Sequence, residues 1–157
     1  MSDLAQQFLA DSRAFLTQDY LPMIERCLAR LTDEQVWARA NQASNSIGNL
    51  ILHLSGSSRY WAADVIDVAP TGRLRQEEFD RRGQVSSKEL LAELRAAVSE
   101  VDRRLAGLSS ERLLETRATH GEKPTVLWCV YHIVEHFAMH TGQIQSMAKA
   151  LVGEIRS

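Results

Sequence analysis

The sequence has few residues that break a helix and no long hydrophobic run. Only three prolines and eight glycines interrupt its 157 residues, and no run of β-branched residues alternates with polar ones. No stretch approaches the roughly 18 unbroken apolar residues of a membrane span. The sequence therefore predicts an all-α protein, and it gives no reason to expect a membrane as a partner.

Neither sign of charge is in excess. The net charge of −2 and the isoelectric point near 6.2 argue against nucleic acid as a partner. The N-terminus shows no basic region followed by an apolar run, so no secretory leader is expected. The two cysteines, Cys27 and Cys129, lie inside apolar helical patterns, where we expect the reduced core thiols of a cytoplasmic protein.

Helical spacing of apolar residues and capping side chains predict four long helices within one domain, residues 1–157. A short turn is expected after Thr32, and Pro124 is expected to open the last helix. The stretch 73–83 is densely charged, and we interpret it as a solvated connection with one short helix. Four long helices with extended connections form a four-helix bundle. The expected helices cover residues 2–31, with a bend near Pro22, and residues 46–65, 86–105 and 124–151.

The last predicted helix carries His132, His136 and His140 at intervals of four residues, which places them on one side of that helix. At about 100° per residue, His140 falls near the middle of the apolar arc and His136 within its edge, whereas His132 lies at its margin. Glu135 falls nearly opposite the arc and should face solvent. Two imidazoles turned toward the core predict a pair of metal ligands. The arc is formed by Val126, Cys129, Ile133, Phe137, Ile144, Met147 and Leu151.

A third histidine, His53, flanks the apolar stripe of the second long helix. From this border position its side chain can face a neighbouring helix and join the inward pair. Alone, such a histidine is most often satisfied by backbone or water, and the spacing leaves both interpretations open.

Two other kinds of metal site find little support. Di-iron carboxylate bundles need inward glutamates and Glu-x-x-His pairs, which the inward faces lack. His132 to His136 match the H-x-x-E-H order of inverted zinc peptidases. Those enzymes take a further ligand well downstream, whereas only 21 residues follow His136.

Two segments resemble the DinB-like superfamily, which includes bacillithiol transferases and mycothiol-dependent enzymes. They are Ser-Ile-Gly-Asn-Leu-Ile-Leu-His-Leu at residues 46–54 and Glu-His-Phe-Ala-Met-His-Thr-Gly-Gln-Ile at residues 135–144. The resemblance spans nearly the whole chain. The charged connection at residues 73–79 is most similar to an uncharacterised branch of the superfamily.

The resemblance implies a four-helix bundle, often a homodimer, with one divalent metal ion on His53, His136 and His140. Zinc is the metal expected first, with nickel or iron as alternatives. Three neutral imidazoles leave an open coordination position on such an ion, as catalytic zinc sites do.

The resemblance further implies thiol transfer, in which a low-molecular-weight thiol attacks a small-molecule electrophile. Two alternatives stay open: a hydrolase that uses water activated by the metal, and a non-catalytic bundle with a structural metal.

Four further side chains are expected beside the ligands or in a substrate pocket. Gln143 and Asn49 each stand one turn from a ligand, where an amide can orient that ligand or be satisfied by backbone. His120, on the connection before the last helix, is expected to be exposed, and His132 to be satisfied by its neighbours. The four side chains are Asn49, Ser57, Tyr60 and Gln143.

Overall fold

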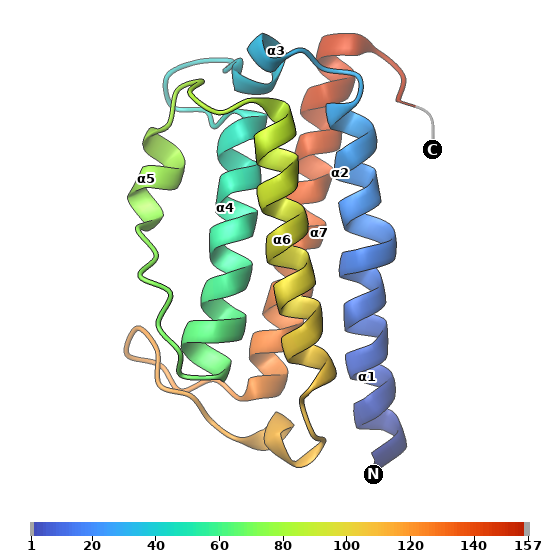
Figure 1. The fold of residues 1–157 in the computed structure, drawn as a ribbon, viewed down its shortest axis with the longest axis vertical. Coiled ribbons are helices and arrows are strands. Elements are labelled where there is room, and N and C mark those ends of the chain that lie inside the picture. Colours follow the sequence, from blue (N-terminus) through green and yellow to red (C-terminus); the bar gives the residue numbers. More distant parts are fainter. Residues whose placement is uncertain (1, 156–157) are drawn as a thin grey trace.

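The computed structural model describes residues 2–155, which form four long helical rods around one apolar core (Figure 1). The predicted all-α bundle is confirmed. Within the described residues the only β pairing consists of two isolated bridges in the connection before the last rod. The rods are α1 (Ser2–Ala14) continued by a π-helical segment (Phe15–Tyr20) and α2 (Leu21–Leu28), α4 (Ile47–Arg59) continued by a π-helical segment (Tyr60–Ile66), α6 (Ser87–Ala106), and α7 (Val126–Val152).

The direction of the rods explains the long connection between α4 and α6. The rod of α1 and α2 runs in the same direction as α7, whereas α4 and α6 run in the opposite direction (Figure 1). Because α4 and α6 are parallel, the chain returns along the outside of the bundle between them. This crossover carries the short helix α5 (Arg75–Asp80), which packs against α4.

The helices begin where the capping side chains lie. Ser46 and Ser86 each accept a hydrogen bond from the N–H of the third residue that follows, whose side chain bonds back. Thr32 does the same for α3 (Asp33–Trp37), so the predicted short turn is confirmed. Thr125 caps α7. Pro124 therefore precedes the cap, and the prediction that it opens this helix is wrong. Its carbonyl accepts a hydrogen bond from the Arg117 N–H in the preceding connection.

Where a bend near Pro22 was predicted, the first rod has a π-helical segment, Phe15–Tyr20, that ends just before Leu21 and Pro22. Pro22 has no N–H to donate to the preceding turn. The chain widens ahead of it, and the Leu21 N–H donates to the carbonyl of Leu16, five residues back. Helix α2 ends at Leu28 rather than at the predicted Leu31, because the N–H groups of Arg30 and Leu31 bond three residues back.

The core confirms most of the predicted apolar arc of α7. Five of its seven members are at most 1% exposed, Met147 is half-buried, and Leu151 in the last turn is 43% exposed. Cys27 and Cys129 are free and buried, as expected. None of the helices formed by residues 2–155 combines the length and apolar character that crossing a lipid bilayer requires.

Candidate metal centre

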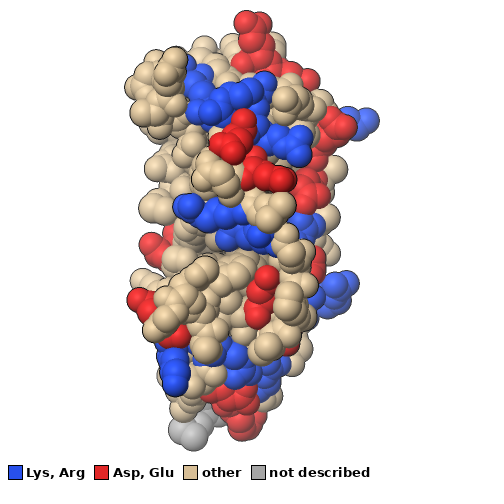
Figure 2. Space-filling model, turned by 90° about the vertical axis from the view of Figure 1, so that its left-hand side faces the viewer, with Lys and Arg blue, Asp and Glu red and all other residues tan. Residues whose placement is uncertain are grey.

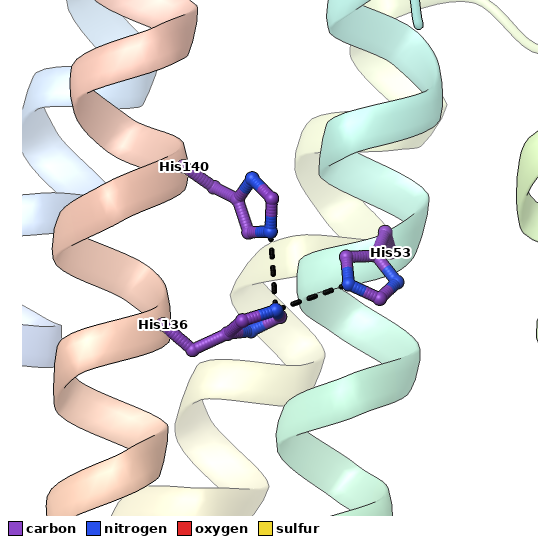
Figure 3. A group of neighbouring side chains, drawn as sticks. All are labelled: His53, His136 and His140. Carbon is purple, nitrogen blue, oxygen red and sulfur yellow. Dashed lines mark hydrogen bonds between the residues drawn. The ribbon is translucent and has the colours of Figure 1, made fainter.

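Three histidines from two neighbouring helices meet inside the bundle (Figure 3). His53 comes from α4, seven residues after its cap Ser46, and it is 6% exposed. His136 and His140 come from successive turns of α7; His136 is half-buried and His140 is 9% exposed. The structure thus brings together the three residues that the sequence and the resemblance single out.

The Nε2 atoms of the three imidazoles converge on one another. Nε2 of His136 lies 3.1 Å from Nε2 of His53 and 3.1 Å from Nε2 of His140. One ligand atom from each residue lies within 4.8 Å of the others. Two nitrogens that bind one tetrahedral zinc ion at about 2.0–2.1 Å lie about 3.3 Å apart. The spacing of the imidazoles therefore fits a single metal ion.

The other ring nitrogens of two histidines have acceptors. Nδ1 of His53 lies 2.9 Å from Oε2 of Glu78, and Nδ1 of His140 lies 2.6 Å from Oε1 of Gln143. An ionised carboxylate and an amide oxygen only accept hydrogen bonds, so both Nδ1 atoms carry the proton. The Nε2 lone pairs of both rings then point toward His136. One imidazole N–H cannot satisfy both of them, whereas a cation binds all three nitrogens.

Burial keeps His136 and His140 neutral. Burial lowers the pKa of His136 to about 3, and the positive charges that His140, His53 and other neighbours would add act in the same direction. Burial also lowers the pKa of His140, against the hydrogen bond to Gln143, which acts in the opposite direction. Neutral imidazole is the form that binds metal.

Acidification should destabilise the metal-free protein through His136. In the unfolded chain His136 takes up a proton below its ordinary pKa of 6.5, whereas the folded protein resists protonation down to about pH 3. The unfolded state binds more protons in this window, so the free energy of unfolding falls as the pH is lowered through it. The slope from this residue is at most about 1.4 kcal/mol per pH unit. Urea unfolding of chelator-treated protein between pH 7 and pH 4 measures it. His136→Gln should show a shallower slope, and equal slopes would contradict the prediction.

Two buried side chains beside the site, Arg73 and Glu78, are not among the predicted residues, because the dense charge of residues 73–83 predicts a solvated connection. On the face that carries α5, basic and acidic side chains are interspersed (Figure 2), as that interpretation requires. It is wrong for Arg73 and Glu78, whose side chains are only 13% and 11% exposed. They pair with each other, and Glu78 contacts His53. Burial raises the pKa of Glu78, but hydrogen bonds from Arg73 and His53 outweigh it and hold the pKa below its ordinary value.

The two amides differ in what they contact. Gln143 meets His140 directly. Asn49 is fully buried and contacts none of the three histidines; its Nδ2 donates to the carbonyls of Glu78 and Arg81. It is therefore satisfied largely by backbone, and it fastens the crossover to α4.

None of the remaining candidates is hydrogen-bonded to the three histidines, although the His132 ring packs beside that of His136, with centroids 5.5 Å apart. Ser57 is buried and makes no hydrogen bond to the three histidines. The hydroxyl of Tyr60 lies 2.6 Å from the Thr119 hydroxyl and 2.9 Å from Nε2 of the exposed His120. His132 contacts Glu135 through Nδ1 and stacks on a tryptophan ring, so it is satisfied by its neighbours, as expected.

Neither cysteine offers a reactive thiolate. Burial raises the pKa of Cys129 to about 11 and raises the pKa of Cys27 as well. A protein thiol that attacks a substrate needs a lowered pKa. A sulfur nucleophile at this site would therefore come from a bound substrate.

A cavity of about 440 Å³ lies beside His140 and is lined by neither His53 nor His136. This volume is typical of small-molecule sites. Apart from the imidazole, the lining contains no ionisable side chain. The lining residues are Ala40, Ser44, Asn45, Leu50, His140, Gln143, Ser146 and Met147.

Two solved structures have the same fold as this chain. A conserved protein from Enterococcus faecalis has a TM-score of 0.74 at 15% identity, with 98% of each chain covered. A DinB-like protein from Bacillus cereus ATCC 10987 has a TM-score of 0.74 at 14% identity, covering 95% of this chain and 94% of the other. At these identities the likeness shows the fold alone.

The family follows from the sequence match. The model of the mycothiol-S-transferase family matches residues 11–151, so the chain belongs to this family. A search of curated proteins found no match. The resemblance to the DinB-like superfamily is confirmed.

Proposed function

We propose that this protein is a metal-dependent thiol S-transferase in which His53, His136 and His140 hold one divalent metal ion. The family is described as transferring mycothiol, which supports a low-molecular-weight thiol as co-substrate. The observation that carries the proposal is the convergence of three imidazoles on one point. Imidazole donors favour zinc, with nickel or iron as alternatives.

A divalent metal at this point would lower the pKa of a thiol beside it, so that the thiolate exists near neutral pH. Neither cysteine of the protein can serve as the nucleophile, since both thiols are buried. In the transfer, the thiol gives up its proton and its sulfur forms a bond to an electrophilic carbon. The displaced group leaves with the electron pair of the broken bond.

The cavity beside His140 is the proposed place of the thiol substrate. Because Gln143 Oε1 is engaged by His140, its amide nitrogen is left without a partner among the described residues. Asn45 and Ser146 add further uncharged polar groups to the lining. Hydroxyl and amide groups suit a neutral, hydroxyl-rich thiol. We expect such a thiol to be preferred over glutathione, which carries two carboxylates.

The proposal is tested by measuring metal and turnover together. Protein prepared without chelator or affinity tag should contain one metal ion per chain. It should also accelerate the reaction of mycothiol with a halogenated bimane. His140→Ala should lose both properties. Met139→Ala, on the exposed side of the same helix, should keep both.

Each other outcome favours a different function. Stoichiometric metal without turnover of mycothiol, bacillithiol or glutathione would leave a structural metal as the explanation. Metal-dependent cleavage of ester or amide substrates without thiol transfer would point to the hydrolase. Metal-free protein with full transferase activity would overturn the proposal.

A further inference from the structure

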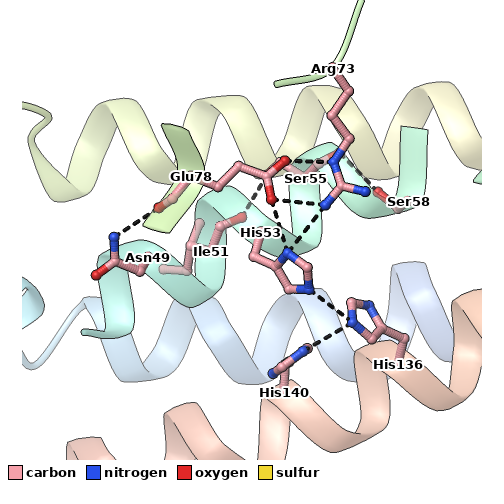
Figure 4. A network of polar contacts seen from close by, with 9 residues as sticks. All are labelled: Asn49, Ile51, His53, Ser55, Ser58, Arg73, Glu78, His136 and His140. Carbon is pink, nitrogen blue, oxygen red and sulfur yellow. Dashed lines mark hydrogen bonds and ion pairs between the residues drawn. The ribbon is translucent and has the colours of Figure 1, made fainter. Parts of the chain in front are cut away.

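A buried ion pair from the crossover lies against His53 on the side opposite to the other two histidines (Figure 4). Nε2 of His53 faces His136, whereas Nδ1 faces the Glu78 carboxylate. A buried carboxylate is costly unless it is paired and fully hydrogen-bonded. The Glu78 carboxylate meets this condition only through Arg73 and His53, so its burial is tied to the histidine that it contacts.

We propose that Glu78 is a positioning residue for the metal ion. Its carboxylate holds the proton of His53 on Nδ1 and so keeps Nε2 bare and aimed at His136 and His140. The inference rests on the proposed metal site and assigns a task to a residue outside the three histidines.

Arg73 fixes the carboxylate in the plane that this task needs. Its Nε donates to Oε1 of Glu78 at 2.6 Å, and its Nη2 donates to Oε2 at 2.8 Å. Such a two-point contact sets orientation as well as distance. Nδ1–H of His53 donates to the same Oε2. Two hydrogens directed at one oxygen explain why Nη2 also lies 3.2 Å from Nδ1.

Gly56 provides the space in which the carboxylate lies. A Cβ at this position of α4 would be only 2.1 Å from Oε1 of Glu78 and 3.0 Å from its carboxyl carbon. No side chain fits there without displacing the carboxylate. A glycine inside a helix costs about 1 kcal/mol relative to alanine, and here it allows the crossover to approach His53.

The backbone of the crossover is fastened as well, by Asn49 on α4 and by Arg39 in the connection before α4. Nδ2 of Asn49 donates to the Glu78 carbonyl at 2.8 Å, and Nη2 of Arg39 donates to the Phe79 carbonyl at 3.1 Å. The Phe79 ring packs on His53, with ring centroids 4.8 Å apart. Both the main chain and the side chain of Glu78 are thus held in place beside the imidazole.

The first test compares metal affinity by competition with a fluorescent zinc chelator. Glu78→Gln keeps the shape but replaces one accepting oxygen by an NH₂ group, which only donates. With the remaining oxygen toward His53, the NH₂ group meets the Nε–H of Arg73; with the amide reversed, it meets Nδ1–H of His53. Removing a partner that orients a ligand typically weakens binding by about 10–100-fold, and this is the expected loss. Gly56→Ala, which pushes the carboxylate away without removing a polar atom, should weaken zinc binding in the same direction.

The matched control is Glu100→Gln. Glu100 lies on α6 and also pairs with arginines, Arg59 and Arg104, but it contacts none of the three histidines. The same change of charge there should leave zinc affinity unaltered. Circular dichroism establishes that each variant is folded before its affinity is compared.

The second test needs no variant. Nitrogen NMR of the metal-free wild-type protein should show His53 with its proton on Nδ1. A proton on Nε2 would overturn the inference. Folded Glu78→Gln and Gly56→Ala proteins with wild-type zinc affinity would overturn it too, and leave the proposed metal site intact. A wild-type protein that binds no metal would overturn both.

Discussion

Replacing His136 by alanine is expected to abolish tight metal binding. Its Nε2 atom lies 3.1 Å from those of both His53 and His140, so the variant loses the central donor. A four-ligand structural zinc site binds with about 10–16 kcal/mol, or roughly 3–4 kcal/mol for each ligand. At about 1.4 kcal/mol per tenfold change, zinc affinity should fall by roughly 10²- to 10³-fold, as measured by chelator competition.

His132→Ala is the matched control for this experiment. His132 lies one turn earlier on α7, where its ring packs 5.5 Å from that of His136, but its Nδ1 is engaged by Glu135 and its ring stacks on Trp128. Its removal takes away an aromatic neighbour and no donor, so zinc affinity should fall far less than in His136→Ala. Undiminished affinity in His136→Ala, or a comparable loss in His132→Ala, would exclude the assigned ligand set.

Replacing Phe137 by alanine is expected to destabilise the fold more than any change at the metal centre. Phe137 is 1% exposed and stands on α7 next to His136, with its ring in the core. Truncating a buried phenylalanine leaves a cavity and typically costs about 3–5 kcal/mol. Urea unfolding of the metal-free protein should show this loss as a lower midpoint with an unchanged slope.

Met139→Ala gives the comparison for an exposed site two residues further along the same helix. Met139 is 48% exposed, and substitutions at such positions usually change stability by less than about 0.5 kcal/mol. If Phe137→Ala cost no more than Met139→Ala, the core assigned to α7 would be wrong.

The helices and the histidine pair could be predicted because they depend on local periodicity. His136 and His140 are four residues apart, and the helical repeat alone places both on the inward side of α7. The caps at Ser46 and Ser86 were visible for the same reason, since a capping box is a contact between residues three apart. For His53 the spacing left two interpretations open, and the family resemblance favoured the ligand.

Glu78 and Arg73 could not be predicted because their position depends on how the crossover folds back on α4. A densely charged segment is normally solvated, and its sequence does not indicate which two side chains turn inward. Two signals lie elsewhere in the chain: Gly56 inside a helix, and the Asn49 amide on a buried face. Neither points to the crossover by itself. Their role is clear only once Glu78 is in place, with its carbonyl on Asn49 and its carboxylate against Gly56.

X-ray absorption at the zinc edge tests the central claim most directly. Protein loaded with one equivalent of zinc and freed of excess should show three imidazole nitrogens at about 2.0–2.1 Å. It should show no sulfur ligand from the two buried cysteines, Cys27 and Cys129. Loss of bound zinc during removal of the excess, or a shell of sulfur at about 2.3 Å, would contradict a centre built from His53, His136 and His140.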